Sequence, residues 1–260
     1  MRFGKYKIYK INELDKSFFN RDRIFDLLLK DIDKPVIFDV GANIGQSVAG
    51  FKQKVPDAVI HSFEPDSDCF DILKSKCADY RDVTAVNAGL GASEDIITLY
   101  KYEESTANSF NRISSDSMAV RSQSHKKVNR CLTQPANTQE CRVLTIDGYC
   151  RENGIGHINL LKIDVQGFEN EVLKGAAEMI GAGRVDIILT ELSFDDLYGK
   201  GNSFYALESH IIPFGYALYD ISHIYKNIRL GKTCWVDALY VRKAYEESVL
   251  NRVISGEQNA

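Results

Sequence analysis

The sequence predicts a doubly wound α/β domain with a mostly parallel, seven-stranded sheet. Short apolar runs alternate with amphipathic stretches along the chain, and several of these runs lead into polar turns that carry acidic residues. The 260 residues are 44% hydrophobic and 26% charged, which suits one substantial core. Strands that alternate with helices form a parallel sheet covered on both faces.

A helical cover is predicted at the start of the chain, over residues 1–34. Between residues 17 and 30, apolar side chains recur among charged ones at the spacing of an amphipathic helix. Pro35 ends this pattern. The main domain is expected at 35–243.

Five short apolar runs in the main domain are typical of buried parallel strands, because they are apolar on both faces. Helical stretches separate most of them. The runs lie at residues 36–40, 59–63, 83–86, 157–163 and 185–189.

The second half of the domain departs from this alternation. Residues 103–140 are rich in Ser, Asn, Thr and Gln, and we predict a long polar insertion over the ligand-binding edge. Two β-prone runs, 216–221 and 235–241, are expected to pair antiparallel at one edge of the sheet. Residues 244–260 are expected to form a helix or a tail.

Composition limits the kinds of molecule that the protein is expected to bind and the compartment in which we expect it. A net charge of −4 argues against a nucleic-acid binder, which would carry a basic stripe. No apolar run approaches the ~20 residues of a membrane span and residue 1 begins no signal peptide, so we expect a cytoplasmic protein. The six cysteines form no Cys-x-x-Cys pair, and we expect no metal site. Homo-oligomerisation is left open.

The turn after the first strand is the first candidate binding element. Gly41 and Gly45 let a backbone approach a ligand, and the following helix start offers N–H groups. A dinucleotide-binding loop has a second glycine where this chain has Asn43, and it has a third that is absent here. The pattern therefore favours a ligand without phosphates, although a tight turn can also be purely structural.

Two carboxylates flank this turn. Glu64 closes the second strand, beside the end of the first, where it can accept hydrogen bonds from both hydroxyls of a ribose. Asp39, at the end of the first strand, can order the loop or receive an amino group. Together they favour an adenosine ligand with a cationic tail.

Two further carboxylates are candidates for proton transfer. Asp164 follows the fourth strand and Glu191 the fifth, so both should face the same rim of the sheet. Asp164 is the first candidate for a general base and Glu191 the second. Asp164 could instead cap the next helix. His125 and His223 are weaker alternatives.

Six stretches of the chain form a set that is specific in order and spacing. They are 38–45 (FDVGANIG), 63–65 (FEP), 86–88 (VNA), 144–147 (LTID), 161–169 (LKIDVQGFE) and 173–176 (LKGA). With this set the chain resembles the FkbM family of methyltransferases. The resemblance implies a Rossmann-like class I methyltransferase fold, S-adenosylmethionine as cofactor, and methylation of a hydroxyl on a sugar, glycan or secondary metabolite.

The same resemblance implies site residues. Asp164 would lie near the transferred methyl group. The family commonly has Glu where this chain has Gln166, and a neutral amide is a poorer ligand for a hard cation, so a metal-assisted mechanism is not favoured. The implied cofactor residues are Asp39, Gly41, Asn43, Gly45, Glu64 and Pro65, with Asn87 and Ala88 near the adenine.

Acceptor contacts are expected from the insertion, where Ser105, Asn108 and Ser109 supply donors and acceptors for a hydroxyl-rich small molecule or glycan. Tyr205, Tyr219 and Trp235 could offer a stacking surface for a sugar ring, or could be core residues. Two other functions stay open: an NAD(P)-dependent oxidoreductase, and a non-catalytic cofactor-binding protein of the same fold.

Overall fold

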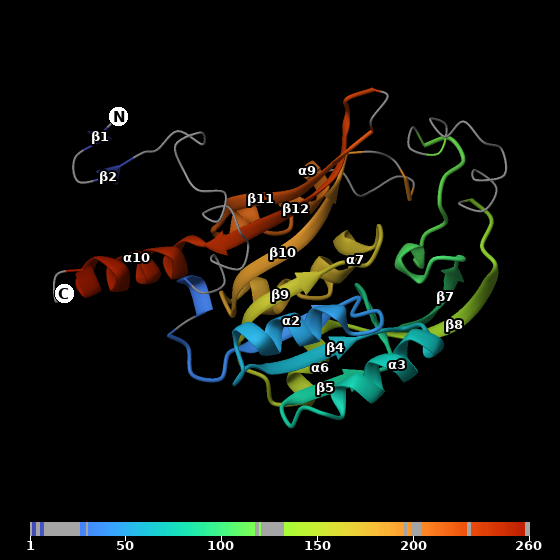
Figure 1. Cartoon of the computed structure of the whole chain (residues 1–260), viewed down its shortest axis with the longest axis horizontal. Helices are drawn as coiled ribbons and strands as arrows, with labels where there is room; N and C mark the ends of the chain where they lie inside the picture. The colour runs from blue at the N-terminus through green and yellow to red at the C-terminus, as the bar shows by residue number, and fades with distance from the viewer. Residues whose placement is uncertain are drawn as a thin grey trace.

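A seven-stranded sheet forms the centre of the computed structural model, in the order β5-β4-β3-β9-β10-β12-β11 (Figure 1). The structure describes residues 2–3, 6–7, 27–29, 31–117, 120, 133–194, 197–198, 204–227 and 230–257. Only β12 runs against the other six strands. The strands are β3 (Val36–Val40), β4 (Val59–Phe63), β5 (Val83–Val86), β9 (Ile158–Ile163), β10 (Val185–Ser193), β11 (Tyr216–Lys226) and β12 (Thr233–Arg242).

The predicted sheet is therefore confirmed, including the antiparallel pair at its edge. The strand order reverses direction between β3 and β9, and ligands of open α/β sheets bind at the carboxyl ends of the strands flanking such a point. This order, with one reversed strand second from the edge, is that of a Rossmann-like class I methyltransferase fold.

Helices cover both faces of the sheet (Figure 1). On one face, apolar side chains of α2 (Gln46–Lys54), α3 (Ser67–Cys77) and α10 (Lys243–Glu257) join one core cluster. The other face packs against α6 (Ile146–Glu152), α7 (Glu169–Lys174), α8 (Ala177–Gly181) and α9 (Phe204–Glu208). A 3-10 turn, η4 (Ile212–Phe214), leads into β11.

Burial on both faces explains why the strand sequences are almost continuously apolar. In β9, the side chains of Ile158, Leu160, Leu161 and Ile163 are at most 1% exposed. Leu160 belongs to one core cluster and Leu161 to the other, since successive side chains point to opposite faces. The register of the central strands is thus fixed by two cores at once.

A smaller sheet projects from the carboxyl side of the main one. It has the order β6-β8-β7, with β6 (Gly89–Leu90), β7 (Asp95–Lys101) and β8 (Asn137–Leu144). A 3-10 turn, η3 (Ser105–Ala107), follows β7. Residues 137–140, which we assign to the polar insertion, belong to β8, because their backbones pair with β7. Residues 118–119 and 121–132 of the insertion lie outside the described residues.

The ends of the chain differ in part from the expectation. Within the predicted helical cover, residues 2–3 (β1, Arg2–Phe3) and 6–7 (β2, Tyr6–Lys7) form a short antiparallel pair. Residues 27–29 are helical, with Leu28 and Leu29 buried in the core, and most of the predicted helix at 17–30 lies outside the described residues. For the C-terminal segment the sequence predicted either a helix or a tail, and its described residues form the helix α10. Among the described helices, none has the length and apolarity to span a membrane.

Two of the stretches that carry the family resemblance, 144–147 and 173–176, have structural roles. Thr145 caps α6 by accepting a hydrogen bond from Gly148 N at 2.9 Å. Asp147 accepts from Glu178 N and Met179 N, at 2.9 and 3.0 Å, and so holds the start of α8. Gly175 lies where a Cβ atom would be 2.0 Å from the carbonyl oxygen of Gly91. These contacts fasten α6–α8 to the small sheet.

We predict that Gly175→Ala lowers the free energy of unfolding by about 1–3 kcal/mol, because the added methyl meets a backbone atom that has little room to move. Gly156→Ala is the matched control, since nothing lies within 4 Å of its Cβ position. Urea unfolding followed by circular dichroism measures both. Equal midpoints for the two variants would show that the contact at Gly175 is not tight.

Candidate active site

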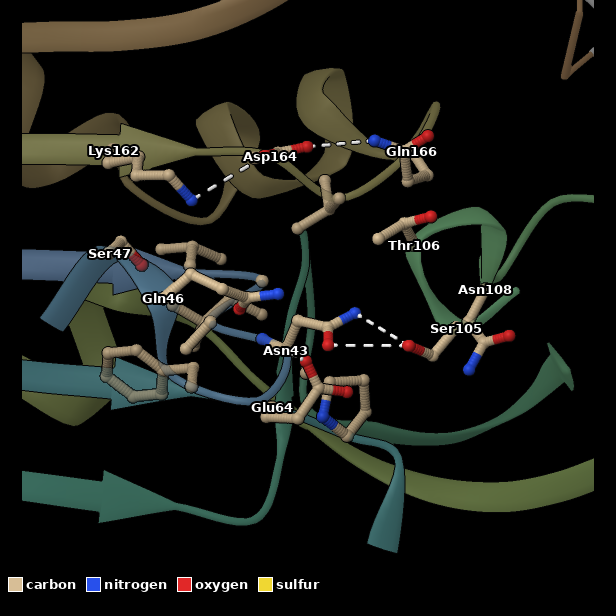
Figure 2. A pocket seen from close by; sticks show the side chains of 18 of the residues that line it. Asn43, Gln46, Ser47, Glu64, Ser105, Thr106, Asn108, Lys162, Asp164 and Gln166 are labelled. Carbon is tan, nitrogen blue, oxygen red and sulfur yellow. Dashed lines mark hydrogen bonds and ion pairs between the residues drawn. The ribbon is translucent and has the colours of Figure 1, made fainter. Parts of the chain in front are cut away.

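A cavity of about 460 Å³ opens at the carboxyl ends of β3, β4, β9 and β10 (Figure 2). Its size falls in the range of small-molecule and cofactor sites. It lies where the strand order reverses. The polar side chains along its wall include Asn43, Gln46, Ser47, Glu64, Ser105, Asn108, Lys162, Asp164 and Gln166.

The glycine turn folds back onto the neighbouring strands. Gly41 has φ 77°, and a Cβ there would lie 1.9 Å from the carbonyl oxygen of Asp164, so only glycine fits. Gly45 (φ 80°) and Asn43 (φ 48°) also lie in the left-handed region. The turn therefore brings the ends of β3 and β9 into direct contact.

The N–H groups of this turn are occupied by the protein itself. Gly41 N and Ala42 N donate to Phe63 O, both at 3.0 Å, and Gly45 N donates to Ala42 O at 2.9 Å. Asn43 N donates to Glu64 Oε2 at 2.8 Å, and Ile44 N donates to Asn43 Oδ1 at 2.7 Å. These five amides cannot cradle a phosphate. The N–H groups that the sequence analysis expects for ligand binding begin at the start of α2, at Gln46.

Glu64 is held rigidly at the edge of the cavity. Its Oε2 accepts from Asn43 N and its Oε1 accepts from Asp66 N, each at 2.8 Å. The residue is 7% exposed, and this burial raises the pKa of its carboxyl to about 7, against the opposing effect of the two backbone hydrogen bonds. Each oxygen keeps a lone pair for a further donor.

Asn87, which directly follows β5, stabilises the backbone at Glu64 and Pro65. Asn87 Nδ2 donates to Glu64 O at 2.9 Å and to Pro65 O at 3.3 Å, and Ala88 is buried. Pro65 lines the cavity, whereas Asn87 and Ala88 do not. Gly89, Leu90 and Phe110 line it instead.

A charged chain runs along the opposite wall. Lys162 Nζ lies 3.0 Å from Asp39 Oδ1 and 3.7 Å from Asp164 Oδ2 (Figure 2). Asp39 is fully buried and also accepts from Ser47 Oγ at 2.5 Å. Our sequence reasoning assigned no role to Lys162. A lysine near the end of an almost continuously apolar strand is the signal that marks it.

The turn after β9 positions Asp164. Its side chain does not cap α7, because the N-cap of that helix is Phe168. Gln166 Nε2 donates to Asp164 Oδ1 at 2.8 Å, and Tyr198 OH donates to Gln166 Oε1 at 2.9 Å. The carboxylate of Asp164 remains 44% exposed, so a ligand can reach it.

Glu169 holds this turn from inside. Its Oε1 accepts from Val165 N at 3.2 Å and from Gly167 N at 3.1 Å. Glu169 is 3% exposed, and burial raises the pKa of its carboxyl to about 7. Gly167 has φ 95° and a Cβ there would be 2.5 Å from Tyr198 Cβ, so the glycine is required.

Glu191 lies beside Asp164 but does not line the cavity. Burial, and then the charges of Asp164, Glu169 and Asp237, raise the pKa of its carboxyl to about 9. Glu191 is therefore protonated at neutral pH and can donate a hydrogen bond. This differs from the role of second base, for which a charged carboxylate is needed.

Comparison with known proteins adds the family. A family model described as "Methyltransferase FkbM domain" matches residues 39–218. The chain belongs to this family. It is a methyltransferase domain, which favours methyl transfer over the nicotinamide chemistry that a similar sheet could support.

Curated relatives of this FkbM domain are named methyltransferases. Methyltransferase sdnD of Sordaria araneosa is 29% identical over 191 residues, which cover 65% of this chain and 72% of that protein. The 2-O-methyltransferase NoeI of Sinorhizobium fredii is 28% identical over 179 residues, which cover 63% of this chain and 65% of that protein. The match thus spans just under two thirds of NoeI.

Among solved structures, the precorrin-6y C5,15-methyltransferase of Geobacter metallireducens aligns with the FkbM domain over 84% of both chains, with 10% identity and a TM-score of 0.42. The fibrillarin/Nop5p complex aligns over 85% of this chain and 81% of that one, with 10% identity and a TM-score of 0.44. The fold is assigned from the strand order, and not from these overlaps.

The insertion residues of the FkbM domain reach the cavity but bond mainly to the protein. Ser105 Oγ lies 3.3 Å from Asn43 Nδ2, and Asn108 Nδ2 donates to Asp66 Oδ2 at 2.7 Å. Ser109 Oγ donates to Gln166 O at 2.5 Å. These side chains tie the insertion to the turns after β3, β4 and β9.

The alternative bases lie elsewhere. His125 is outside the described residues, and His223 Nδ1 pairs with Asp237 Oδ2 at 2.9 Å on the outer strands. Tyr205 is 82% exposed on α9. Within the described part of the chain, no group of three or more His, Cys, Asp or Glu side chains could hold a metal ion.

We predict that Lys162→Met lowers the free energy of unfolding by about 3 kcal/mol, because it leaves the buried charge of Asp39 without its cation. Lys174→Met, which removes an exposed pair with Glu171, should cost less than about 1 kcal/mol. Thermal or urea unfolding gives both values.

A double variant sharpens this test. Asp39→Asn combined with Lys162→Met should be more stable than the sum of the single effects, because each change removes the unpaired charge left by the other. Strict additivity would mean that Lys162 and Asp39 do not stabilise each other.

Proposed function

We propose that this FkbM domain transfers a methyl group from S-adenosylmethionine to a hydroxyl of a sugar, glycan or secondary metabolite, with Asp164 as general base. The observation that carries the proposal is the pairing of a buried carboxylate, Glu64, with a turn whose N–H groups are all occupied. Such a site suits a nucleoside, and the turn itself offers no unbonded N–H group to a pyrophosphate.

The residues of the cavity fit the proposed cofactor. Glu64 can accept hydrogen bonds from two ribose hydroxyls, because each of its oxygens makes only one bond to the protein. Leu90 and Phe110 offer apolar contacts for a flat base. Lys162 lines the far side of the cavity, with Asp39 buried behind it, and this ion pair suits the charged amino-acid end of the molecule. When bound, the cofactor supplies an electrophilic methyl group.

The chain's own part in the reaction is to orient the acceptor and to remove a proton. The acceptor hydroxyl must approach the methyl in line, and its proton must leave as the C–O bond forms. Asp164 is accessible at the cavity and is fixed by Gln166 on one oxygen and by Lys162 near the other. Fixing both oxygens keeps the carboxylate in one orientation for proton transfer.

Glu191 has a different proposed role. A protonated carboxyl beside Asp164 can donate a hydrogen bond to the acceptor or to the base, and it cannot itself take the proton at neutral pH. The two carboxyl groups are thereby separated into an acceptor and a donor of hydrogen bonds.

The affinity for S-adenosylmethionine should depend on pH through Glu64. The charged form binds ribose hydroxyls more strongly, and burial places the pKa of this carboxyl at about 7. We predict that the affinity falls as the pH is lowered from 8 to 6, approaching tenfold per pH unit below 7. Isothermal titration calorimetry in buffers of matched ionic strength measures this.

Glu64→Gln tests whether Glu64 causes the pH dependence of the affinity for S-adenosylmethionine. This variant should bind the cofactor about 10- to 100-fold more weakly at pH 8 and should lose the pH dependence. Glu178→Gln, on the exposed surface, should behave as the unmodified protein. A pH profile that survives in Glu64→Gln would assign it to another group.

Two isosteric variants test whether Asp164 is the general base and Glu191 a hydrogen-bond donor. Asp164→Asn should keep cofactor binding and slow methyl transfer by roughly 100-fold or more, because it removes the base. Glu191→Gln should retain turnover within a few-fold, because the amide resembles the protonated carboxyl. The measurement is a 14 Da mass gain on an acceptor panel that includes sugars. The opposite ranking of the two variants would make Glu191 the base.

A further inference from the structure

An exposed aromatic pair lies on the β11–β12 hairpin, close to the proposed reaction centre. Tyr225 and Trp235 are cross-strand partners whose rings stack with centroids 5.1 Å apart and planes at 25°. Tyr225 is 51% exposed and Trp235 is half-buried. Cross-strand aromatic pairs stabilise hairpins, but a pair left this open to water also offers a binding surface.

Strand register places the pair on the same face as the site. Lys162 is opposite Leu189, and Leu189 is opposite Leu239, so these side chains share one face of the sheet. Glu191 and Asp237 are opposite each other two residues further along, and Ser193 and Trp235 two further again. Because side chains alternate with a period of two, Trp235 shares the face that carries Lys162 and Glu191.

The separation suits a bound ring. One further step of the same parallel register puts Asp164 opposite Glu191, with Asp237 on the next strand. Trp235 is two residues beyond Asp237, so the backbones of Asp164 and Trp235 are roughly 12 Å apart, given about 4.8 Å between strands and about 3.3 Å per residue. A sugar ring bound on the aromatic pair would span part of that gap, with its hydroxyls directed toward Asp164.

Polar groups lie beside the aromatic pair. Asp237 Oδ2 holds His223 Nδ1 at 2.9 Å, and the side chain of His223 is 49% exposed. The register of β11 shifts between Ser222 and Tyr225, and His223 has φ 45° within this bulge. A bulge re-aims the side chains around it, here bringing an imidazole to the carboxylate of the neighbouring strand.

We propose that Tyr225 and Trp235, with Asp237 and His223 beside them, form the acceptor subsite and that it binds a pyranoside ring. The C–H face of a pyranose is apolar and packs on an aromatic ring, while its hydroxyls need hydrogen-bond partners at the rim. This inference deepens the proposed function and relies on it for the reaction at Asp164. Binding of the ring itself does not depend on the cofactor.

The hairpin extends past the end of β10, on the side of the molecule toward which β7 and β8 also extend (Figure 1). An acceptor larger than one sugar can therefore continue from the aromatic pair into solvent. Two other occupants could cover this surface: a compact apolar metabolite or a second copy of the chain. Glycoside titration distinguishes the first, and sedimentation distinguishes the second.

Trp235 makes the experiment direct, because it is the only tryptophan among the 260 residues. The probes are methyl β-D-glucopyranoside and methyl α-L-rhamnopyranoside at millimolar concentration, with sorbitol as an acyclic polyol control. We expect a saturable change in tryptophan emission with the glycosides and none with sorbitol. Absence of a saturable change with both glycosides, or an equal change with sorbitol, would overturn the proposal.

Variants assign the change to the aromatic pair. Tyr225→Ala should weaken glycoside binding at least about fivefold, and Tyr225→Phe should bind as the unmodified protein. Tyr205→Ala is the control, because Tyr205 is 82% exposed on α9, which packs on the other face. If Tyr225→Ala unfolds, Tyr225→Leu keeps an apolar side chain without the ring, and it should show the same loss. Undiminished binding in the variant that folds would contradict the proposal.

Two further measurements separate this inference from the proposed function. Cofactor affinity, measured by calorimetry without glycoside, should be unchanged in Tyr225→Ala. A protein that binds glycosides at Trp235 but no S-adenosylmethionine would refute the function and retain the subsite. Sedimentation velocity at the same concentrations reports self-association, and a dimer whose dissociation accounts for the emission change would overturn the subsite.

Discussion

The rest of the site depends on the contact between the turns after β3 and β9. Gly41 approaches the carbonyl oxygen of Asp164 so closely that no side chain fits between them. This contact sets the position of Asp164 relative to the glycine turn, and Lys162 then bridges Asp39 and Asp164 across the same two strands. The turn proposed to hold the cofactor and the proposed base are thus placed relative to each other by a single backbone contact.

Two buried carboxyl groups, Glu64 and Glu169, and the half-buried Glu191 show how the environment separates the pKa values of chemically identical side chains. Burial raises the pKa values of Glu64 and Glu169 to about 7 and that of Glu191 to about 9. Glu64 and Glu169 each accept two backbone N–H groups, which oppose the rise. Glu191 is surrounded by other carboxylates and has the highest pKa. Hydrogen bonding to the charged form, and not residue type, separates the three.

Local sequence patterns predicted much of the fold and part of the site. The buried strands follow from apolar runs and turns, and the position of Glu64 follows from its place at a strand end, whereas the strand order is implied only by the family resemblance. The sequence could not predict that Asn87 and Ala88 lie behind the cavity wall, because Asn87 is drawn to the carbonyls of Glu64 and Pro65 by long-range packing. Nor could it predict β8 at residues 137–140, since strand pairing with β7 overrides a polar composition there.

The polar insertion and the β11–β12 hairpin have different roles at the carboxyl edge of the sheet. Ser105, Asn108 and Ser109 use their hydrogen bonds on the strand-end turns at Asn43, Asp66 and Gln166, so they stabilise the cofactor side of the cavity. A side chain already bonded to the protein has less to offer an acceptor, because a new bond must replace an existing one. The outer hairpin carries exposed rings and an exposed imidazole instead. The proposed acceptor subsite on β11 and β12 is therefore separate from these turns, so substitutions there can alter acceptor choice without disturbing the turns proposed to hold the cofactor.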